Sequence, residues 1–308
     1  MVAFDAESGA QPHERVFANQ ISEGLRRSKY MLIDRPSVNP FVFTTASQVP
    51  ALPSASQGQV NTIIVPGAFG LNAIEMFQST AQSKFPARSA DVGLEIGLDL
   101  VNNESVEYVP GGNDALNPLA YVRGTDPGVL HRLTLAFADV SGTDQFFVGF
   151  RKLEAYQVPT SVLSAGDGLY TDFIGIGFSG AANPNDVKIV SDLNNSGSTT
   201  VHDTGFNWAD GLYHKLEVHV AAGKVRFFIN GVELGGTVSK DALGNAITAQ
   251  ATIARALFTF DDGDTLIPVV FHRYDSATPG AVIARRWEVG QLLEVGLQSS
   301  GRGPQAAS

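Results

Sequence analysis

The feature of this sequence that most constrains its fold is a period of two in the placement of apolar side chains. From Val92 to Leu100, Val, Leu and Ile alternate with Gly, Glu and Asp. Successive side chains of a strand point to opposite faces of its sheet, so this alternation predicts a strand with one buried and one solvated face. The pattern recurs in further segments: Leu133–Phe137, Phe146–Phe150, Ile174–Phe178, Leu216–Val220, Val225–Ile229 and Val282–Val289.

Turn chemistry and one continuous apolar run indicate how these strands are arranged. Asn230–Gly231 supplies the two positive φ angles of a type I′ turn, which predicts a hairpin of Lys224–Ile229 with Val232–Val238. Leu266–Phe271 is apolar almost without alternation, which favours a position in the middle of the sandwich. Many short strands with hardly any helical pattern predict an all-β sandwich or barrel.

The ends of the chain differ in composition from its centre. Residues 36–59 are rich in Pro, Ser, Ala and Gln, which favours an extended segment because the residue before each Pro avoids the α region. Pro12–Leu32 carries a weak helical spacing, so a short surface helix and an irregular segment both stay open there. We therefore predict an N-terminal arm or linker over residues 1–60, a β-sandwich over 61–298 and a flexible tail over 299–308.

Composition and charge exclude several classes of function. The net charge is −10, and the basic residues are scattered, which argues against direct nucleic-acid binding. The chain has no Cys, so disulfides, thiolate metal sites and cysteine nucleophiles are excluded. The N-terminus does not resemble a signal peptide, and no stretch approaches the roughly 18 apolar residues of a membrane span. We expect no membrane partner.

One segment resembles a known family. Phe206–Leu234 is similar to the second half of concanavalin-like and laminin-G-like jelly rolls, in which a Trp-x-x-Gly-x-x-His pattern precedes an alternating strand and a Phe-x-Ile-x-Gly hairpin. The matching residues are Trp208, Gly211, His214, Leu216, Val218, Phe227, Ile229 and Gly231. The resemblance covers about residues 60–290 and implies an antiparallel, concanavalin-like jelly-roll β-sandwich. The whole-chain sandwich with a Pro/Ser-rich arm is also similar to virion proteins of tailed phages.

Two groups of carboxylates are candidate sites. Glycosidases of this fold carry a Glu-x-Asp-x-x-Glu strand, and retaining hydrolysis needs two carboxyl groups about 5–5.5 Å apart. Glu95 and Asp99 share a strand face, but the third carboxylate is missing, so a solvated face is the simpler interpretation. Asp261, Asp262 and Asp264 could bind calcium, because hard cations take several carboxylate oxygens. A tight acidic turn is the alternative, and no other cofactor is predicted.

An aromatic residue flanked by polar ones gives the candidate ligand site. Trp208, with Asn207 and Asp210 beside it, could form an aromatic platform for a sugar; the alternative is a core residue that closes the sandwich. The polar loop Asp192–Gly205 is long enough to take part in binding or to form an exposed hairpin. None of the six histidines forms a metal-binding pair in the sequence.

These observations leave competing hypotheses for function. The first is a non-enzymatic virion structural protein of a tailed phage, as a head decoration, minor capsid or fibre-base component. It would be made in the host cytoplasm, contact other virion proteins such as the major capsid protein, and form a homo-oligomer. The second is a carbohydrate-binding module that mediates surface attachment, with a glycan as its partner. The third is a glycosidase.

Overall fold

The computed structural model describes most of the segments in which strands are expected. The described residues are 29–36, 38–44, 59–78, 86–89, 93–96, 104–140, 145–157, 170–179, 185–193, 200–221, 224–234, 260–274 and 281–292. Every regular element in these ranges is a β-strand, and all the paired strands run antiparallel. The described ranges contain no helix that is long and apolar enough to cross a membrane.

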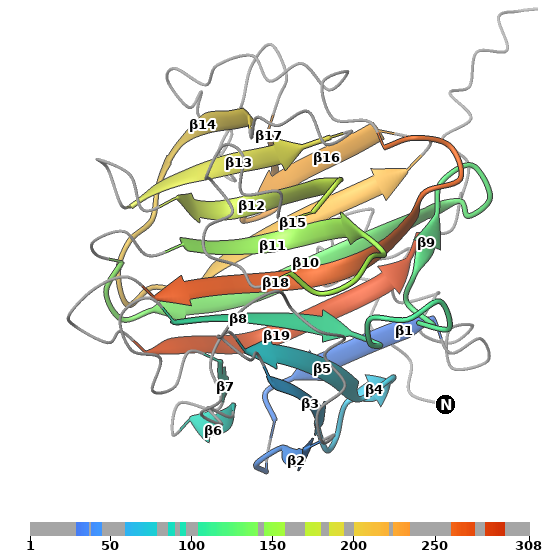
Figure 1. Cartoon of the computed structure of the whole chain (residues 1–308). Coiled ribbons are helices and arrows are strands. Elements are labelled where there is room, and N and C mark those ends of the chain that lie inside the picture. Colours follow the sequence, from blue (N-terminus) through green and yellow to red (C-terminus); the bar gives the residue numbers. More distant parts are fainter. Residues whose placement is uncertain are drawn as a thin grey trace, which may run out of the picture.

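The first layer of the fold is a nine-stranded sheet (Figure 1). Its main path runs in the order β17 (Val232–Leu234), β16 (Lys224–Ile229), β15 (His214–Ala221), β10 (Gly128–Phe137), β19 (Val282–Gln291), β1 (Tyr30–Asp34) and β4 (Phe69–Gly70). Beside this path, β7 (Gly93–Glu95) pairs with β19 and with β6 (Ala87–Ser89).

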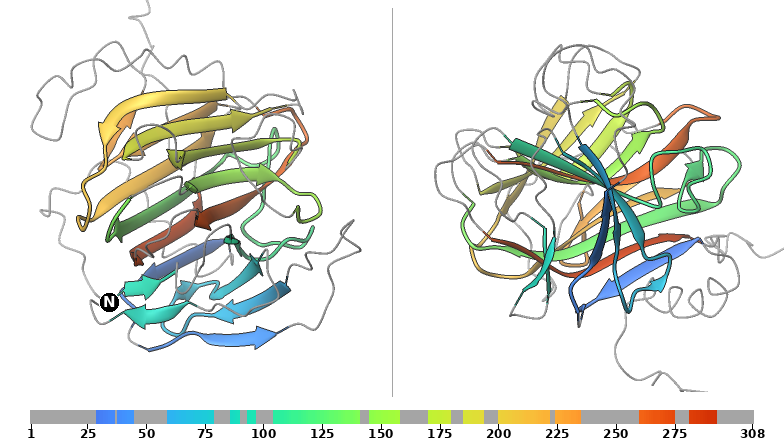
Figure 2. Two further views of the ribbon diagram at one scale, coloured as in Figure 1. Left: turned by 60° about the vertical axis from the view of Figure 1, so that its left-hand side comes forward. Right: turned by 60° about the horizontal axis from the view of Figure 1, so that its bottom comes forward.

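The second layer is a ten-stranded sheet. Its path runs in the order β14 (Thr200–Asn207), β13 (Asp186–Asp192), β12 (Phe173–Ser179), β11 (Gln145–Lys152), β18 (Thr265–Tyr274), β8 (Glu104–Pro110), β5 (Ala73–Gln78), β3 (Gln59–Ile64) and β2 (Phe41–Thr44), and β9 (Tyr121–Val122) pairs with β18. The strands of residues 30–78 lie together at one end of the molecule, and β14 lies at the opposite end (Figures 1 and 2).

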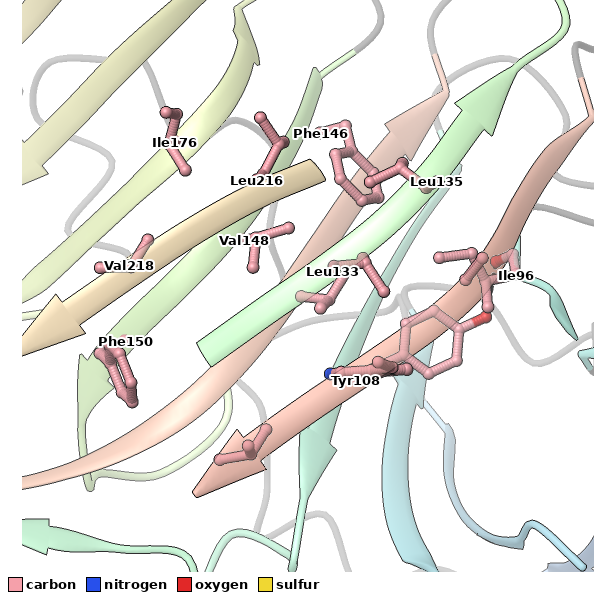
Figure 3. Packing of buried hydrophobic residues seen from close by; sticks show 14 of the residues in the cluster. Ile96, Tyr108, Leu133, Leu135, Phe146, Val148, Phe150, Ile176, Leu216 and Val218 are labelled. Atoms are coloured by element: carbon pink, nitrogen blue, oxygen red, sulfur yellow. Dashed lines mark hydrogen bonds between the residues drawn. The ribbon is translucent and has the colours of Figure 1, made fainter. Parts of the chain in front are cut away.

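The core lies between the two sheets and follows from the period of two. Phe146, Val148 and Phe150 of β11 point inward and pack with Leu133 and Leu135 of β10 (Figure 3). The alternate residues of β11 therefore face away from the nine-stranded sheet, on what we call the outer face of the ten-stranded sheet. The prediction of an all-β antiparallel sandwich is confirmed.

Two polar side chains are buried within this core and find partners there. Tyr108 donates a hydrogen bond from its hydroxyl to the carbonyl oxygen of Ile96 at 2.6 Å. His131 of β10 contacts the opposite sheet, because its Nδ1 lies 2.8 Å from the carbonyl oxygen of Gly149. Trp287 donates from Nε1 to Nε2 of His131 at 2.9 Å, which leaves the His131 proton on Nδ1. A neutral histidine thus connects the two layers.

The hairpin and the central strand lie where the sequence predicts them. Asn230 and Gly231 have φ angles of 52° and 82°, and they join β16 to β17 as expected for a type I′ turn. Residues beyond Leu234 in the expected second strand lie outside the described part of the chain. The continuously apolar β18 lies between β11 and β8, and both of its faces are buried.

The expected N-terminal arm over residues 1–60 needs correction. Tyr30–Asp34 forms β1, which pairs along its whole length with β19, and Met31 and Ile33 belong to the core. Phe41–Thr44 forms β2 and pairs with β3. The Pro-rich composition of residues 36–59 gives no indication of β2. The last residues of the weak helical spacing in Pro12–Leu32 belong to β1 instead of a helix. Residues 1–28 and the tail at 299–308 lie outside the described part of the chain.

Candidate functional site

The candidate sugar platform at Trp208 has no exposed aromatic face. The Trp208 side chain is 2% exposed. Its ring meets those of Phe137, Phe178 and His214 at centroid distances of 5.9, 4.8 and 4.5 Å. Stacking on a sugar needs a free ring face, so Trp208 instead occupies the position of a core residue, which was the alternative interpretation.

The residues beside Trp208 hold the end of the sandwich together. Asp210 is exposed, but its Oδ1 accepts a hydrogen bond from the backbone N–H of Val140 at 3.0 Å. The backbone N–H of Gly211 donates to the carbonyl oxygen of Phe137 at 2.6 Å. Asn207 is exposed at the end of β14. The Trp-x-x-Gly-x-x-His segment therefore connects strands of both sheets.

The acidic segment at residues 261–264 forms a tight turn. Gly263 has a φ of 91°, and the backbone N–H of Asp261 donates to Oδ2 of Asp264 at 3.2 Å. Asp262 pairs with Arg123. These contacts correspond to the turn that was the alternative to a calcium site.

The second carboxylate oxygen of Asp264 is also paired. Asp264 Oδ1 lies 2.6 Å from Lys152 Nζ, so an ammonium group already neutralises it. Within the described ranges, no group of three or more His, Cys, Asp or Glu residues is arranged to hold a metal ion. For the glycosidase hypothesis, Glu95 is partly exposed on β7, whereas Asp99 lies outside the described residues.

A cluster of polar and aromatic side chains lies on the outer face of the ten-stranded sheet. We call it the Arg151 cluster, and it consists of Glu75, Glu107, Asn113, Arg151, Tyr156 and Tyr170. These residues come from β5, β8, β11 and the segments that follow β8 and β11 or precede β12. A small group of buried apolar side chains lies on the same outer face: Phe147, Tyr170, Phe173, Val190, Val269 and Phe271.

The buried floor of the Arg151 cluster is an ion pair. Arg151 and Glu107 each have 0% exposure, and Arg151 donates from Nε to Glu107 Oε1 at 2.8 Å. Tyr170 donates its hydroxyl to the other oxygen, Oε2, at 2.6 Å. The Arg151 guanidinium also lies over the Tyr170 ring at 4.2 Å. Both charges are therefore compensated, as burial requires.

The rim of the Arg151 cluster is partly exposed. Glu75 Oε2 accepts hydrogen bonds from the Tyr156 hydroxyl at 3.0 Å and from the Asn113 backbone N–H at 2.8 Å. The Tyr156 ring stacks on Phe77 with centroids 4.8 Å apart and an angle of 12° between the planes. Glu75, Asn113 and Tyr156 all keep partial exposure. A buried charged floor thus holds a set of solvent-accessible hydrogen-bonding groups.

Burial and charge fix the protonation of the cluster. Burial is the largest single effect on Arg151 and lowers its pKa, but Glu107, Tyr170 and Tyr156 together outweigh burial and raise that pKa. Burial raises the pKa of Tyr170 and of Tyr156, and the neighbouring carboxylates raise them further. At neutral pH both phenols are protonated, so they donate hydrogen bonds to Glu107 and Glu75.

The loop that carries Asn113 is tightly held. Asn117 is buried, and its Nδ2 donates to the carbonyl oxygens of Pro110 and Gly112 at 3.0 and 2.6 Å. Its Oδ1 accepts from the backbone N–H of Leu119 at 2.8 Å. Asn113 Nδ2 in turn donates to the carbonyl oxygen of Glu154 at 3.0 Å. This loop therefore presents Asn113 to the cluster in a fixed orientation.

The sequence did not reveal the Arg151 cluster. Arg151 and Glu107 are 44 residues apart, and Tyr170 and Glu107 are 63 apart, so no local motif contains them. One signal was present in Gln145–Lys152. The residues that alternate with the inward phenylalanines are Phe147, Gly149 and Arg151, and an apolar residue among them indicates that the outer face is also covered.

No protein-family model matches the sequence, and no curated protein matches it. Several solved structures are similar in their sandwich arrangement. A carbohydrate-binding module, CBM66 from Bacillus subtilis, covers 68% of this chain and 92% of its own, with 8% identity and a TM-score of 0.37. A B. subtilis protein of unknown function with a galectin-like fold covers 67% and 86%, with 11% identity and a TM-score of 0.38. A β-1,3-glucanase from Mycobacterium marinum covers 81% and 97%, with 10% identity and a TM-score of 0.35.

Proposed function

We propose that this chain is a non-catalytic glycan-binding β-sandwich, and that the Arg151 cluster is its binding site. The observation that carries the proposal is the partly exposed rim of Glu75, Asn113 and Tyr156 held by a buried ion pair. Sugars are recognised by fixed hydrogen-bonding groups beside aromatic rings, and binding is strongest when the protein groups are already ordered. The rim meets both requirements.

The same geometry argues against hydrolysis at this site. A retaining glycosidase needs one carboxylate as nucleophile and one carboxylic acid as proton donor. Glu107 is fully buried and is bound by Arg151 and Tyr170, so it can neither attack a sugar nor donate a proton to one. Glu75 accepts hydrogen bonds from the Tyr156 hydroxyl and the Asn113 backbone N–H, so it is held within the cluster as an acceptor. Binding without turnover is the function that these contacts support.

A glycan array probed with the purified chain tests this proposal. We expect binding to a limited set of glycans, and a loss of at least tenfold in affinity for Tyr156→Ala, because the ring of the rim is removed and Glu75 loses the hydroxyl that holds it. Tyr213→Ala is the matched control, since Tyr213 is also partly exposed but stacks with Arg285 outside the cluster. Its affinity should equal that of the natural chain. An array without any signal, or equal losses for both variants, would contradict the proposal.

A second candidate function is the assembly of a tailed-phage particle. Two exposed aromatic side chains favour an assembly role: Phe41 on β2 is 62% exposed and Phe69 on β4 is 55% exposed. Both strands end the paths of their sheets at the same end of the sandwich (Figure 1). Exposed aromatics at a sheet edge are suited to contact with another subunit.

Sedimentation of the purified chain tests this candidate. If the edge mediates assembly, the natural chain should sediment as a closed oligomer, and Phe41→Ser with Phe69→Ser should shift it to the monomer. Leu212→Ser is the control, because Leu212 is 58% exposed and lies between Trp208 and β15. A natural chain that sediments as a monomer at all concentrations would remove the support that Phe41 and Phe69 give.

A further inference from the structure

We infer that the Arg151 cluster selects uncharged glycans and rejects acidic ones, an inference that rests on the proposed glycan-binding function. Acidic sugars are bound through unsatisfied Arg or Lys donors or through a bound cation. The cluster contains an arginine, which at first suggests an anion site. Its hydrogen bonds show the opposite.

The donors of Arg151 are all used within the protein. A guanidinium has five N–H groups. Nε donates to Glu107, Nη2 to Glu107 and to Asn113 Oδ1, each at 2.8 Å. Nη1 donates to the carbonyl oxygens of Lys152 and Glu154 at 3.1 and 3.4 Å. Because its donors are occupied and its side chain is fully buried, Arg151 has no free N–H group to donate to a carboxylate or sulfate of a ligand.

The lysine that follows Arg151 in the chain is also paired. Lys152 Nζ lies 2.6 Å from Asp264 and 3.5 Å from Asp172, so it faces two carboxylates. A third acidic ligand group would have to displace one of them. The two basic residues closest to the rim in the chain therefore serve the protein's own acidic groups.

The exposed surface of the rim and of the residues beside it in the chain is acidic. Glu75 and Glu154 are partly exposed, and Asp114, next to Asn113 in the chain, is exposed. Glu154 Oε1 accepts from the backbone N–H of Thr171 at 2.7 Å, which holds it in place. A carboxylate in a fixed position accepts hydrogen bonds from sugar hydroxyls and repels anions. The ligand that fits is therefore rich in hydroxyl groups and carries no negative charge.

Binding of two polysaccharide panels tests this inference. The neutral probes are dextran, mannan and laminarin, and the acidic probes are alginate, polygalacturonate and heparin. We expect binding to at least one neutral probe and to no acidic probe, with an affinity that changes less than about twofold between low and high salt, because no ligand charge is screened. EDTA should not change the affinity.

Glu75→Gln identifies the carboxylate that accepts from the ligand. This change keeps the size of the side chain but removes its charge, and we expect about tenfold or more weaker binding. Glu233→Gln is the matched control, since Glu233 is also a partly exposed carboxylate on a strand, paired with Arg226 at 2.9 Å in the other sheet. Unfolding midpoints in urea show whether both variants stay folded.

The outcomes separate this inference from the proposed function. Binding to acidic probes that weakens with salt would overturn the selection of uncharged glycans, while glycan binding itself would stand. Neutral binding that is unchanged in Glu75→Gln would overturn the role of the rim carboxylate. The absence of binding to every probe would overturn both the selection of uncharged glycans and the proposed glycan-binding function. Neutral binding that Glu75→Gln weakens and Glu233→Gln leaves intact supports both.

Discussion

Replacing Arg151 with leucine is expected to lower the free energy of unfolding by about 3–5 kcal/mol, because it leaves the Glu107 carboxylate buried without its cation. Glu107 has 0% exposure, so water cannot replace the lost partner. Tyr170 would remain as a donor to Glu107, but a single phenol does not compensate a full charge. Equilibrium unfolding in urea, followed by fluorescence of the two tryptophans, measures the change.

A matched surface pair provides the control for this prediction. Arg226 donates from Nε to Glu233 at 2.9 Å, and both side chains are partly exposed. Arg226→Leu should therefore cost no more than about 1 kcal/mol. The double variant Arg151→Leu with Glu107→Met should recover part of the loss, since no unpaired charge remains buried. Equal losses for Arg151→Leu and Arg226→Leu would contradict the buried ion pair.

The sandwich was predictable because its signal is local. In β11, Phe146, Val148 and Phe150 repeat every second residue, and a strand needs no distant information to show that period. The turn at Asn230 was equally visible, because the φ angles of a type I′ turn restrict which residues can occupy it. These elements were predicted from a few neighbouring residues each.

The strand at Tyr30–Asp34 shows where local patterns fail. Its sequence YMLID has apolar residues at four successive positions, and it is short and lies near a Pro-rich segment. Both of its faces are buried, since Met31 faces the core while Tyr30 and Leu32 pack with Leu130. Periodicity cannot separate such a strand from a helix end, so pairing with β19 decides its structure.

The Arg151 cluster could not be predicted for a related reason. Its members come together because β5, β8, β11 and β18 are neighbours in one sheet. The order of strands in a sheet cannot be inferred from the sequence of any single segment. Trp208 was a candidate because its flanking residues are polar, yet its own ring is buried. The polar residues beside Trp208 lie at the surface, whereas its ring packs inside the sandwich against Phe137 and Phe178.

Lowering the pH from about 7 to about 5 is expected to reduce the free energy of unfolding by about 2 kcal/mol for each of His131 and His272. Burial lowers the pKa of both side chains to about 4, and for His131 the Gly149 carbonyl opposes this only in part. The unfolded chain binds these protons near the ordinary histidine pKa of 6.5, whereas the folded chain does so only near 4. The contribution of each neutral histidine to stability is therefore fully present above pH 6.5, and it is lost as the pH falls from 6.5 to about 4.

Urea unfolding at several pH values in this window measures the loss, and two variants assign it. His272→Leu should remove about half of the pH dependence, because His272 packs against Phe137 and Phe146 and a leucine there does not titrate. His131→Leu should remove the other half, because His131 is the second fully buried histidine whose pKa burial lowers. The loss of stability in this window does not come from Glu217. Burial raises the pKa of Glu217, but His219, Arg132 and Lys215 outweigh burial and lower that pKa. The contribution of Glu217 to stability is therefore lost only at more acidic pH. A free energy of unfolding that stays level from pH ~7 to pH ~5 would show that the two buried histidines are not held neutral between the sheets.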